Sequence, residues 1–409
     1  MRLPRLSSSL FLTLFALISF LPIGCRADEP LPTGPHQMRV VWKGDAQREA
    51  TISWSTLSEG TTHRLHYRPA GSDQWQTLDC QRSGRHPGKL EGGKRLYYHH
   101  ARLTDLSPST RYNFQCESDG EKTRELYFVT APEKDLPRAI IFGGDSRSGI
   151  EARRDVNRMI ARMVEEQSAA SRPPILALAH GGDYIADGRK LPQWYEWLTD
   201  QELTIGRDGR VLPIIPARGN HDVGPLFDEI FDFPPGDGNY YTTDLGPQVR
   251  LTTLNTEVST SGDQRSWLEA ELKANRRKFR WYVAQYHTPA FPAVKAPSTA
   301  YANWVPLFDQ YRLDLVCEAD GHNIKRTSPI LDNKIHPDGI VYIGEGGLGV
   351  GQRTPKTDRW YLAEMAEKNS LGHHVHLLTF DADYLDVRVI RLGGETFDNF
   401  QLFPRKWDE

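Results

Sequence analysis

The chain has 409 residues, which exceeds the length of one compact domain and predicts two. Charged residues make up 25% of the chain and the formal net charge is −3, which argues against a nucleic-acid binder that relies on a basic surface. Hydrophobic residues make up 38%, enough for globular cores, and the 34 glycines and 27 prolines indicate many turns.

Residues 1–27 have the pattern of a secretory signal peptide. Two early arginines precede the apolar residues 10–23, a stretch that is short for a membrane span. Cleavage near Ala27 fits this pattern. Alternatively, residues 21–25 resemble a bacterial lipoprotein box, in which Cys25 would carry the lipid. We therefore expect a secreted or periplasmic protein that meets a membrane only if Cys25 is lipidated.

Residues 35–132 show short alternating apolar and polar runs separated by turn residues, which predicts an all-β sandwich. Cys80 and Cys116 within this segment are a plausible disulfide in an oxidising compartment. The Trp54 pattern, the Leu-x-Pro-x-Thr-x-Tyr turn at residues 106–112 and the closing strand of the segment resemble a fibronectin type III module.

Residues 137–403 follow a different pattern, in which apolar strands alternate with helices, and this predicts an α/β layered sheet. Apolar residues recur at helical spacing between residues 156 and 164. Towards the end, residues 375–390 predict a hairpin and residues 391–403 a closing strand pair.

Five strand-like runs in this second segment each lead to a polar residue that can bind a metal. These residues are Asp145, Asp183, Asn220, His287 and His322, and Asp320 stands beside the last of them. Ligands collect at the carboxyl ends of strands in open α/β sheets, so we expect these side chains to share one site. Carboxylate, amide oxygen and imidazole suit zinc, manganese or iron. A carboxylate shared by two ions would hold them about 3.5–4 Å apart, with a hydroxide nucleophile between them.

The order of these motifs resembles the calcineurin-like metallophosphoesterases, and together with the preceding sandwich it is similar to the purple acid phosphatases. The strongest motif is Gly-Asn-His-Asp at residues 219–222, supported by Gly182-Asp183 and by Tyr-His-Thr-Pro at residues 286–289. The resemblance implies an α/β (α+β) core of two β-sheets flanked by helices, with metals at the strand ends.

The same resemblance implies an enzyme that hydrolyses phosphomonoesters by a metal-activated hydroxide. Its expected partner is a phosphate ester substrate and not a nucleic acid. A phosphodiesterase or nucleotidase on the same core, and a catalytically impaired binding or adhesion protein, are the alternatives.

Carried over residue by residue, the resemblance implies a role for each candidate residue. Asp145 and His322 would bind a first metal, Asp183 would bridge two metals, and Asn220, His287 and Asp320 would bind the second. His221 would be the catalytic histidine beside the phosphate.

Three departures from the family pattern affect this assignment. Arg147 stands where many relatives have a histidine ligand, and an arginine cannot ligate because it stays protonated. Asp320 also stands where the family has a histidine. Ala186 stands where purple members have a tyrosine, so a ferric-tyrosinate centre is not expected, and the adjacent Tyr184 cannot take that place. Either Arg147 clamps the substrate phosphate over a weakened two-metal site, or its guanidinium replaces the first metal. We therefore expect one or two divalent ions of iron, zinc or manganese.

Overall fold

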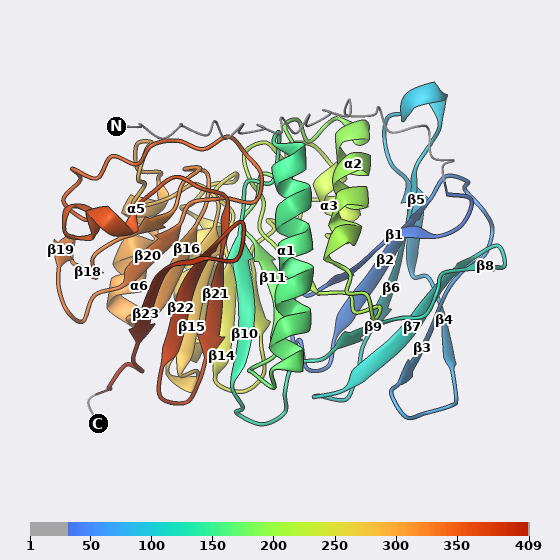
Figure 1. Cartoon of the computed structure of the whole chain (residues 1–409), viewed down its shortest axis with the longest axis horizontal. Helices are drawn as coiled ribbons and strands as arrows, with labels where there is room; N and C mark the ends of the chain where they lie inside the picture. The colour runs from blue at the N-terminus through green and yellow to red at the C-terminus, as the bar shows by residue number, and fades with distance from the viewer. Residues whose placement is uncertain (1–31, 408–409) are drawn as a thin grey trace, which may run out of the picture. The chain divides into compact units, whose positions relative to one another are not determined.

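The first strands of the chain form the β-sandwich that the sequence predicts (Figure 1). This computed structural model describes residues 32–407, so the predicted signal segment and Cys25 lie outside the described residues. One layer contains β1 (His36–Val41), β2 (Ala50–Thr56), β6 (Tyr97–Leu103) and β5 (Arg82–Arg85). The other contains β4 (Gln76–Asp79), β3 (His63–Pro69), β7 (Arg111–Ser118), β8 (Glu121–Lys122) and β9 (Leu126–Val129). Alternate side chains such as Trp54, Leu65 and Phe114 are buried between the layers.

Cys80 and Cys116 are free thiols, so the predicted disulfide is wrong. Cys116 lies on β7 and Cys80 directly follows β4, and β3 separates these two strands in the sheet. Strands on either side of a third are about 9–10 Å apart, which exceeds the reach of a disulfide.

The α/β core consists of two layers of strands, of which the first belongs to the same sheet as β1, β2, β6 and β5. The first continues through β12 (Ile214–Pro216), β11 (Ile175–His180), β10 (Arg138–Gly143), β21 (His374–Phe380), β22 (Leu385–Arg391) and β23 (Thr396–Leu402). The second contains β13 (Tyr241–Asp244), β14 (Val249–Thr253), β15 (Trp281–Tyr286), β16 (Leu315–Glu318), β20 (Val341–Gly344) and β17 (Lys325–Arg326), beside a small hairpin of β18 (Ile330–Leu331) and β19 (Lys334–Ile335). The hairpin predicted at residues 375–390 is present, but residues 391–403 hold one closing strand, β23, instead of a pair.

Helices cover the outer faces of the two core sheets (Figure 1). The α-helices are α1 (Ile150–Ala169), α2 (Leu191–Gln201), α3 (Leu226–Ile230), α4 (Asp263–Asn275), α5 (Ala300–Asn303) and α6 (Val305–Tyr311), and short 3₁₀ turns occur at Glu91–Gly93, Glu202–Thr204, Arg276–Lys278 and Ala363–Lys368. Val156, Ile160 and Val164 of α1 pack on Ile141 and Leu178, which confirms the helical spacing seen in the sequence. No helix in the part of the chain that the structure describes has the length and apolarity needed to cross a bilayer.

The sandwich and the core share one ten-stranded sheet. The junction is a parallel pairing of β1 with β12, in which Val41 lies opposite Ile214 and the Trp42 N–H donates to the Ile214 carbonyl at 3.0 Å. Apolar side chains of both parts belong to one buried cluster. The sandwich is therefore fixed against the core through backbone and side chains alike.

Candidate metal centre

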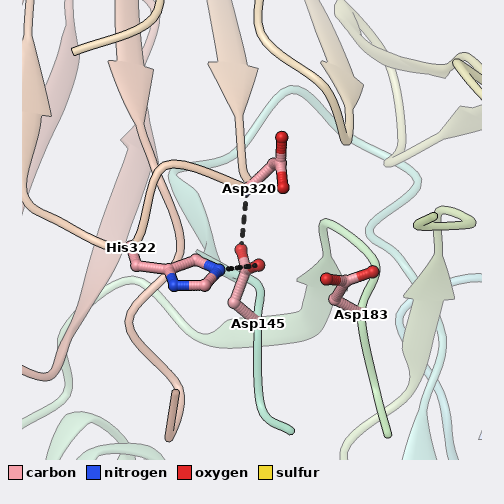
Figure 2. Close-up of side chains that lie close together, drawn as sticks. All are labelled: Asp145, Asp183, Asp320 and His322. Atoms are coloured by element: carbon pink, nitrogen blue, oxygen red, sulfur yellow. Dashed lines mark hydrogen bonds and ion pairs between the residues drawn. The ribbon is translucent and has the colours of Figure 1, made fainter. Parts of the chain in front are cut away.

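The predicted ligands meet at the carboxyl ends of the core strands. Asp145 follows β10, Asp183 follows β11, Asn220 follows β12, His287 follows β15, and Asp320 and His322 follow β16. Four of them, Asp145, Asp183, Asp320 and His322, are buried and offer ligand atoms that all lie within 4.8 Å of one another (Figure 2). The two sheets thus bring together residues separated by up to 177 positions, from 145 to 322.

These four residues share an unusual backbone conformation. The φ angles are 59° at Asp145, 60° at Asp183, 66° at Asp320 and 61° at His322. Left-handed φ angles are uncommon in residues other than glycine and cost roughly 1–3 kcal/mol each, so they persist where the surrounding structure imposes them. All four candidate ligands therefore lie on loops whose backbone is held in place by the surrounding structure.

The loops approach one another so closely that glycine is required between them. A Cβ atom on Gly182, whose φ is +97°, would lie 2.6 Å from the backbone nitrogen of Gly219. A Cβ atom on Gly346 would lie 2.0 Å from an oxygen of Asp145. The glycines of the Gly-Asp motif at residues 182–183 and of the loop at residues 344–347 are therefore required by packing.

The Asp145 side of the site contains a buried carboxylate that is only half satisfied. Asp145 Oδ2 accepts a hydrogen bond from the Asp320 N–H at 2.8 Å. Oδ1 lies 3.3 Å from His322 Nε2 but has no hydrogen-bond partner among the described residues. An unpaired buried carboxylate oxygen is costly, and a cation at this point would satisfy it. The residues present therefore fit a divalent metal.

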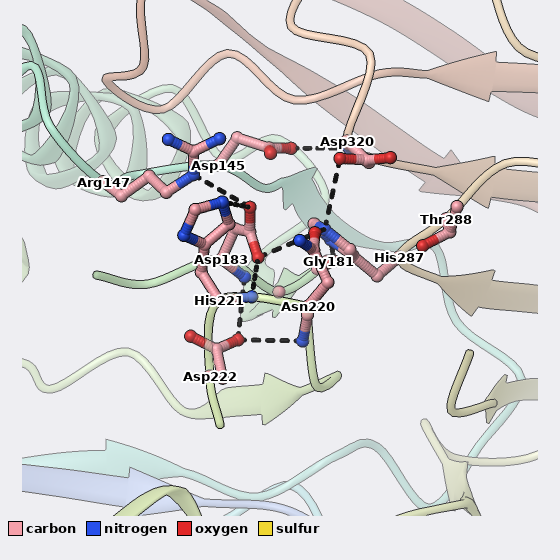
Figure 3. A network of polar contacts seen from close by, with 12 residues as sticks. Asp145, Arg147, Gly181, Asp183, Asn220, His221, Asp222, His287, Thr288 and Asp320 are labelled. Atoms are coloured by element: carbon pink, nitrogen blue, oxygen red, sulfur yellow. Dashed lines mark hydrogen bonds and ion pairs between the residues drawn. The ribbon is translucent and has the colours of Figure 1, made fainter. Parts of the chain in front are cut away.

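Arg147 lies over the same side of the site (Figure 3). Its Nε donates to Asp183 Oδ2 at 2.9 Å, and its Nη2 lies 3.3 Å from His322 Nε2. The guanidinium thus contacts two of the three protein groups predicted for the first metal.

The other side of the site converges on one imidazole nitrogen. His287 Nε2 lies 3.1 Å from Asn220 Oδ1, 3.2 Å from Asp183 Oδ1 and 3.7 Å from Asp320 Oδ1. His287 Nδ1 donates to the Gly181 carbonyl at 2.9 Å, which leaves Nε2 directed at the three oxygens. Burial alone would lower the pKa of His287, but the surrounding carboxylates, Asp183 foremost, raise it well above its usual range. The carboxylates around His287 therefore favour a positive charge at this point.

His221 and Asp222 divide the signature motif between the site and its scaffold. His221 Nδ1 donates to the Ala186 carbonyl at 2.6 Å, and Nε2 lies 3.9 Å from Asp183 Oδ2 on a side chain that is 32% exposed. Asp222 is fully buried and accepts the N–H groups of Asp183 and Gly219, both at 2.8 Å. Asp222 therefore ties the Asp183 loop to the Asn220 loop, a role that the motif alone did not reveal.

Tyr184, which the sequence excludes from the place of the missing tyrosine, packs into a buried apolar cluster. Its side chain is fully buried and its ring stacks on His180 at a centroid distance of 3.9 Å. It therefore cannot supply the phenolate that Ala186 lacks.

Sequence reasoning missed Lys295, which reaches the site from the segment after β15. Its Nζ donates to Asp320 Oδ1, and Arg359 holds the backbone of this segment by donating to the carbonyls of Val294 and Lys295 at 2.9 and 2.6 Å. A lone lysine in a loop carries no signal in the sequence that would assign it to the site.

Sequence reasoning also missed a buried ionic network behind the ligand loops. Lys325 is fully buried, and its Nζ donates to Glu318, to Glu345 Oε1 at 2.9 Å and to the Phe291 carbonyl at 3.0 Å. The Glu345 carbonyl accepts the His322 N–H at 2.6 Å. Lys325 thereby links the loop after β15, the end of β16 and the loop after β20.

The fold and the site define a metallophosphoesterase. Residues 35–131 match the family described as purple acid phosphatase, N-terminal domain, and residues 149–323 match the family described as calcineurin-like phosphoesterase. The chain belongs to the calcineurin-like metallophosphoesterases that carry a purple acid phosphatase N-terminal domain.

Relatives of this chain include purple acid phosphatases at low identity. Two uncharacterized proteins of Mycobacterium tuberculosis are 25% identical over 353 residues, which cover 76% of this chain and 63% of theirs. The purple acid phosphatase of Glycine max is 23% identical over 389 residues, which cover 84% and 80%. The purple acid phosphatase from yellow lupin (Lupinus luteus) seeds is similar in fold, with a TM-score of 0.73 at 16% identity over 90% of this chain and 74% of that one.

Proposed function

We propose that this protein is a metal-dependent phosphoesterase that hydrolyses phosphomonoesters. The observation that carries the proposal is the convergence of three aspartates, two histidines and one asparagine on one edge of the two sheets. The purple acid phosphatases among its relatives support the same reaction class.

The metal in this proposal is held by the side of the site around His287. Asp183, Asn220, His287 and Asp320 would bind one divalent ion of zinc, manganese or iron. On the other side, Arg147 contacts Asp183 and His322, and its guanidinium supplies positive charge there. When bound, a divalent ion polarises a phosphoryl oxygen and acidifies a water molecule.

Two side chains of the chain itself would act on the phosphate. Arg147 places N–H donors beside Asp183, where they can bind phosphoryl oxygens. His221 donates through Nδ1 to a backbone carbonyl, so its Nε2 is free to hold the proton that the leaving oxygen takes up.

The test combines turnover with metal content. His221→Ala is expected to lower the kcat for p-nitrophenyl phosphate roughly 10²–10⁴-fold while metal per chain, measured by mass spectrometry of the elements, stays the same. His66→Ala, in the sandwich, is the control and is expected to change neither quantity. Loss of metal in His221→Ala would contradict its assigned role. Less than one equivalent of metal in the unaltered protein, with no hydrolysis in added manganese, zinc or iron, would refute the proposal that the protein is an enzyme.

A catalytically impaired binding protein is the second candidate, because two cations pair with ligand carboxylates. Arg147 binds Asp183 and Lys295 binds Asp320, so a metal must compete with both. The same metal measurement separates this candidate from the enzyme. Comparison of bis-p-nitrophenyl phosphate with the monoester ranks the phosphodiesterase alternative.

We also propose that the protein is secreted or periplasmic, on the strength of the apolar residues 10–23 behind two arginines. Intact mass of the mature protein tests this. A start after Ala27 supports export, a lipid on Cys25 supports a membrane anchor, and an uncleaved start would contradict both.

A further inference from the structure

The loop that carries the signature motif leads directly into α3, which has only five residues. So short a helix has little stability of its own, and its last carbonyl groups need outside partners. The sandwich supplies them. His100 Nε2 donates to the Glu229 carbonyl at 2.8 Å, and Arg39 Nε donates to the Ile230 carbonyl at 2.8 Å. The end of α3 is thus capped by residues of β6 and β1.

Two residues beyond α3, the sandwich also surrounds a fully buried carboxylate. Arg102 donates to both oxygens of Asp232, at 2.6 and 2.8 Å, and Arg82 Nη1 lies 3.3 Å from Oδ1. Lys43 donates to the Asp232 carbonyl, and Arg82 donates to the Phe233 carbonyl at 2.9 Å. Burial alone would raise the pKa of Asp232, but Arg102 and the other cations hold it at about 2. Three cations of the sandwich, Lys43, Arg82 and Arg102, therefore bind residues 232–233 of the core.

Arg218 connects α3 to the signature loop, the loop of residues 217–222 that carries the Gly-Asn-His-Asp motif. Its Nε donates to the Asp222 carbonyl at 3.0 Å and its Nη2 to the Gly224 carbonyl at 2.7 Å, while its Nη1 lies 3.6 Å from Asp228 on α3. Asp222 in turn holds the loop of Asp183. A continuous chain of polar contacts joins the sandwich to the loop that carries Asn220 and His221.

We propose that the N-terminal sandwich is a positioning element for the loop of Asn220 and His221. It acts through the capped end of α3 and through the ion pairs with Asp232. Simple adhesion between the two parts of the chain is the competing explanation. It predicts that weakening any sandwich–core contact loosens the molecule as a whole. Positioning predicts a local effect on residues 217–231. The activity readout of the test rests on the proposed function, whereas the amide exchange readout does not.

The experiment compares two sandwich–core contacts in the full chain. Asp232→Asn weakens the ion pairs that Asp232 forms with Arg102, Arg82 and Lys43. Tyr127→Phe is the matched control, because the Tyr127 hydroxyl donates to Asp208 in the segment before β12, and this contact involves neither α3 nor Asp232. Amide hydrogen exchange by mass spectrometry is expected to speed up at least about fivefold in residues 217–231 of Asp232→Asn and to stay unchanged in residues 286–296. Tyr127→Phe is expected to leave both segments unchanged.

Turnover gives the second readout. Asp232→Asn is expected to lower kcat for p-nitrophenyl phosphate roughly tenfold with KM within about twofold, because a misplaced His221 impairs chemistry more than binding. If Asp232→Asn does not fold, Arg102→Gln replaces it, since Arg82 and Lys43 still face Asp232. Unchanged exchange in residues 217–231, or equally faster exchange throughout the molecule, overturns the positioning role. Faster local exchange in a protein without phosphatase activity would uphold positioning and refute the proposed function instead.

Discussion

Arg147 is the residue that most distinguishes this site from the family pattern. Its guanidinium contacts Asp183 and His322, so positive charge already stands beside ligands of the first metal. An ion that binds there must compete with a hydrogen bond to a fully buried carboxylate. Charge-assisted bonds of this kind are roughly twice as strong as neutral ones, so this bond opposes the binding of an ion at the first-metal position.

Arg147→His is expected to raise the metal content from about one towards two ions per chain, because an imidazole replaces a cation that cannot ligate. Elemental mass spectrometry of protein purified without chelator measures the ratio. Arg147→Gln is the matched control, since it removes the charge without adding an imidazole. Equal metal content in the histidine variant and the unaltered chain would refute the assignment of Arg147 to the first-metal side.

At this scale, the sequence predicted residues that follow strands and missed those that reach the site from loops. Asp145, Asp183 and His287 each come directly after an apolar run, and the structure brings them together. Lys295 lies in a loop held by Arg359, and no periodic pattern places either residue. Lys325 was also missed, because a lysine in an amphipathic stretch is normally solvated, whereas here it is fully buried between two glutamates.

At the scale of elements, the site depends on how closely the strand-end loops approach. Gly182 and Gly71 have similar φ angles of +97° and +87°, but only Gly182 faces a neighbouring backbone. The two glycines therefore allow the strain of a positive φ to be separated from the effect of contact between loops.

Gly182→Ala is expected to lower the free energy of unfolding by about 3 kcal/mol and to abolish metal binding, because its Cβ would collide with Gly219. Gly71→Ala is expected to cost roughly 1–2 kcal/mol through backbone strain alone, with metal binding intact. Urea unfolding and metal titration measure the two effects. Equal losses in both variants would show that loop contact contributes nothing at Gly182.

Element types were predictable where the pattern was long and failed where it was short. The twenty residues of α1 repeat apolar side chains at helical spacing, and this helix was found. The segment 391–403 was predicted as a strand pair, but it is a turn followed by β23 alone. Its two glycines, at residues 393 and 394, have positive φ angles and end β22 without opening another strand.

At the scale of the whole molecule, buried histidines link stability to pH. Burial, with a smaller contribution from His63, lowers the pKa of His99 to about 3, and burial lowers that of His374 to about 4. Each folded-state pKa lies below the unfolded value of about 6.5, so the unfolded chain binds more protons as the pH falls through this range. The contribution of these two histidines to stability is therefore full above about pH 6.5 and declines below it.

Each of these histidines is expected to cost about 1.4 kcal/mol of unfolding free energy per pH unit between about pH 6 and pH 4.5. His99→Gln should reduce the slope of unfolding free energy against pH by the contribution of His99. The double variant His99→Gln with His374→Gln should reduce the slope by the contributions of both histidines. Urea unfolding at pH 7, 6 and 5 measures the slopes. Identical slopes in the unaltered chain and both variants would contradict this origin of acid sensitivity.

The shared sheet was the largest feature that the sequence did not reveal. The pairing of Val41 with Ile214 joins segments 173 positions apart, from 41 to 214, and leaves no local signal in either strand. Fold class follows from local patterns, whereas contacts between distant strands depend on the whole packed core.

The shared sheet also affects whether the sandwich and the core can exist as separate domains. A detachable domain can be lost or exchanged, because its neighbour keeps a finished surface. Here the core ends at β12, a strand of three residues, and β1 covers its open edge. A core without its sandwich would present unpaired backbone groups and the apolar side chains of the common cluster to other chains. Removal of the sandwich is therefore expected to destabilise the core, and insertions are better tolerated at exposed turns such as residues 393–394 than at the junction between the two parts.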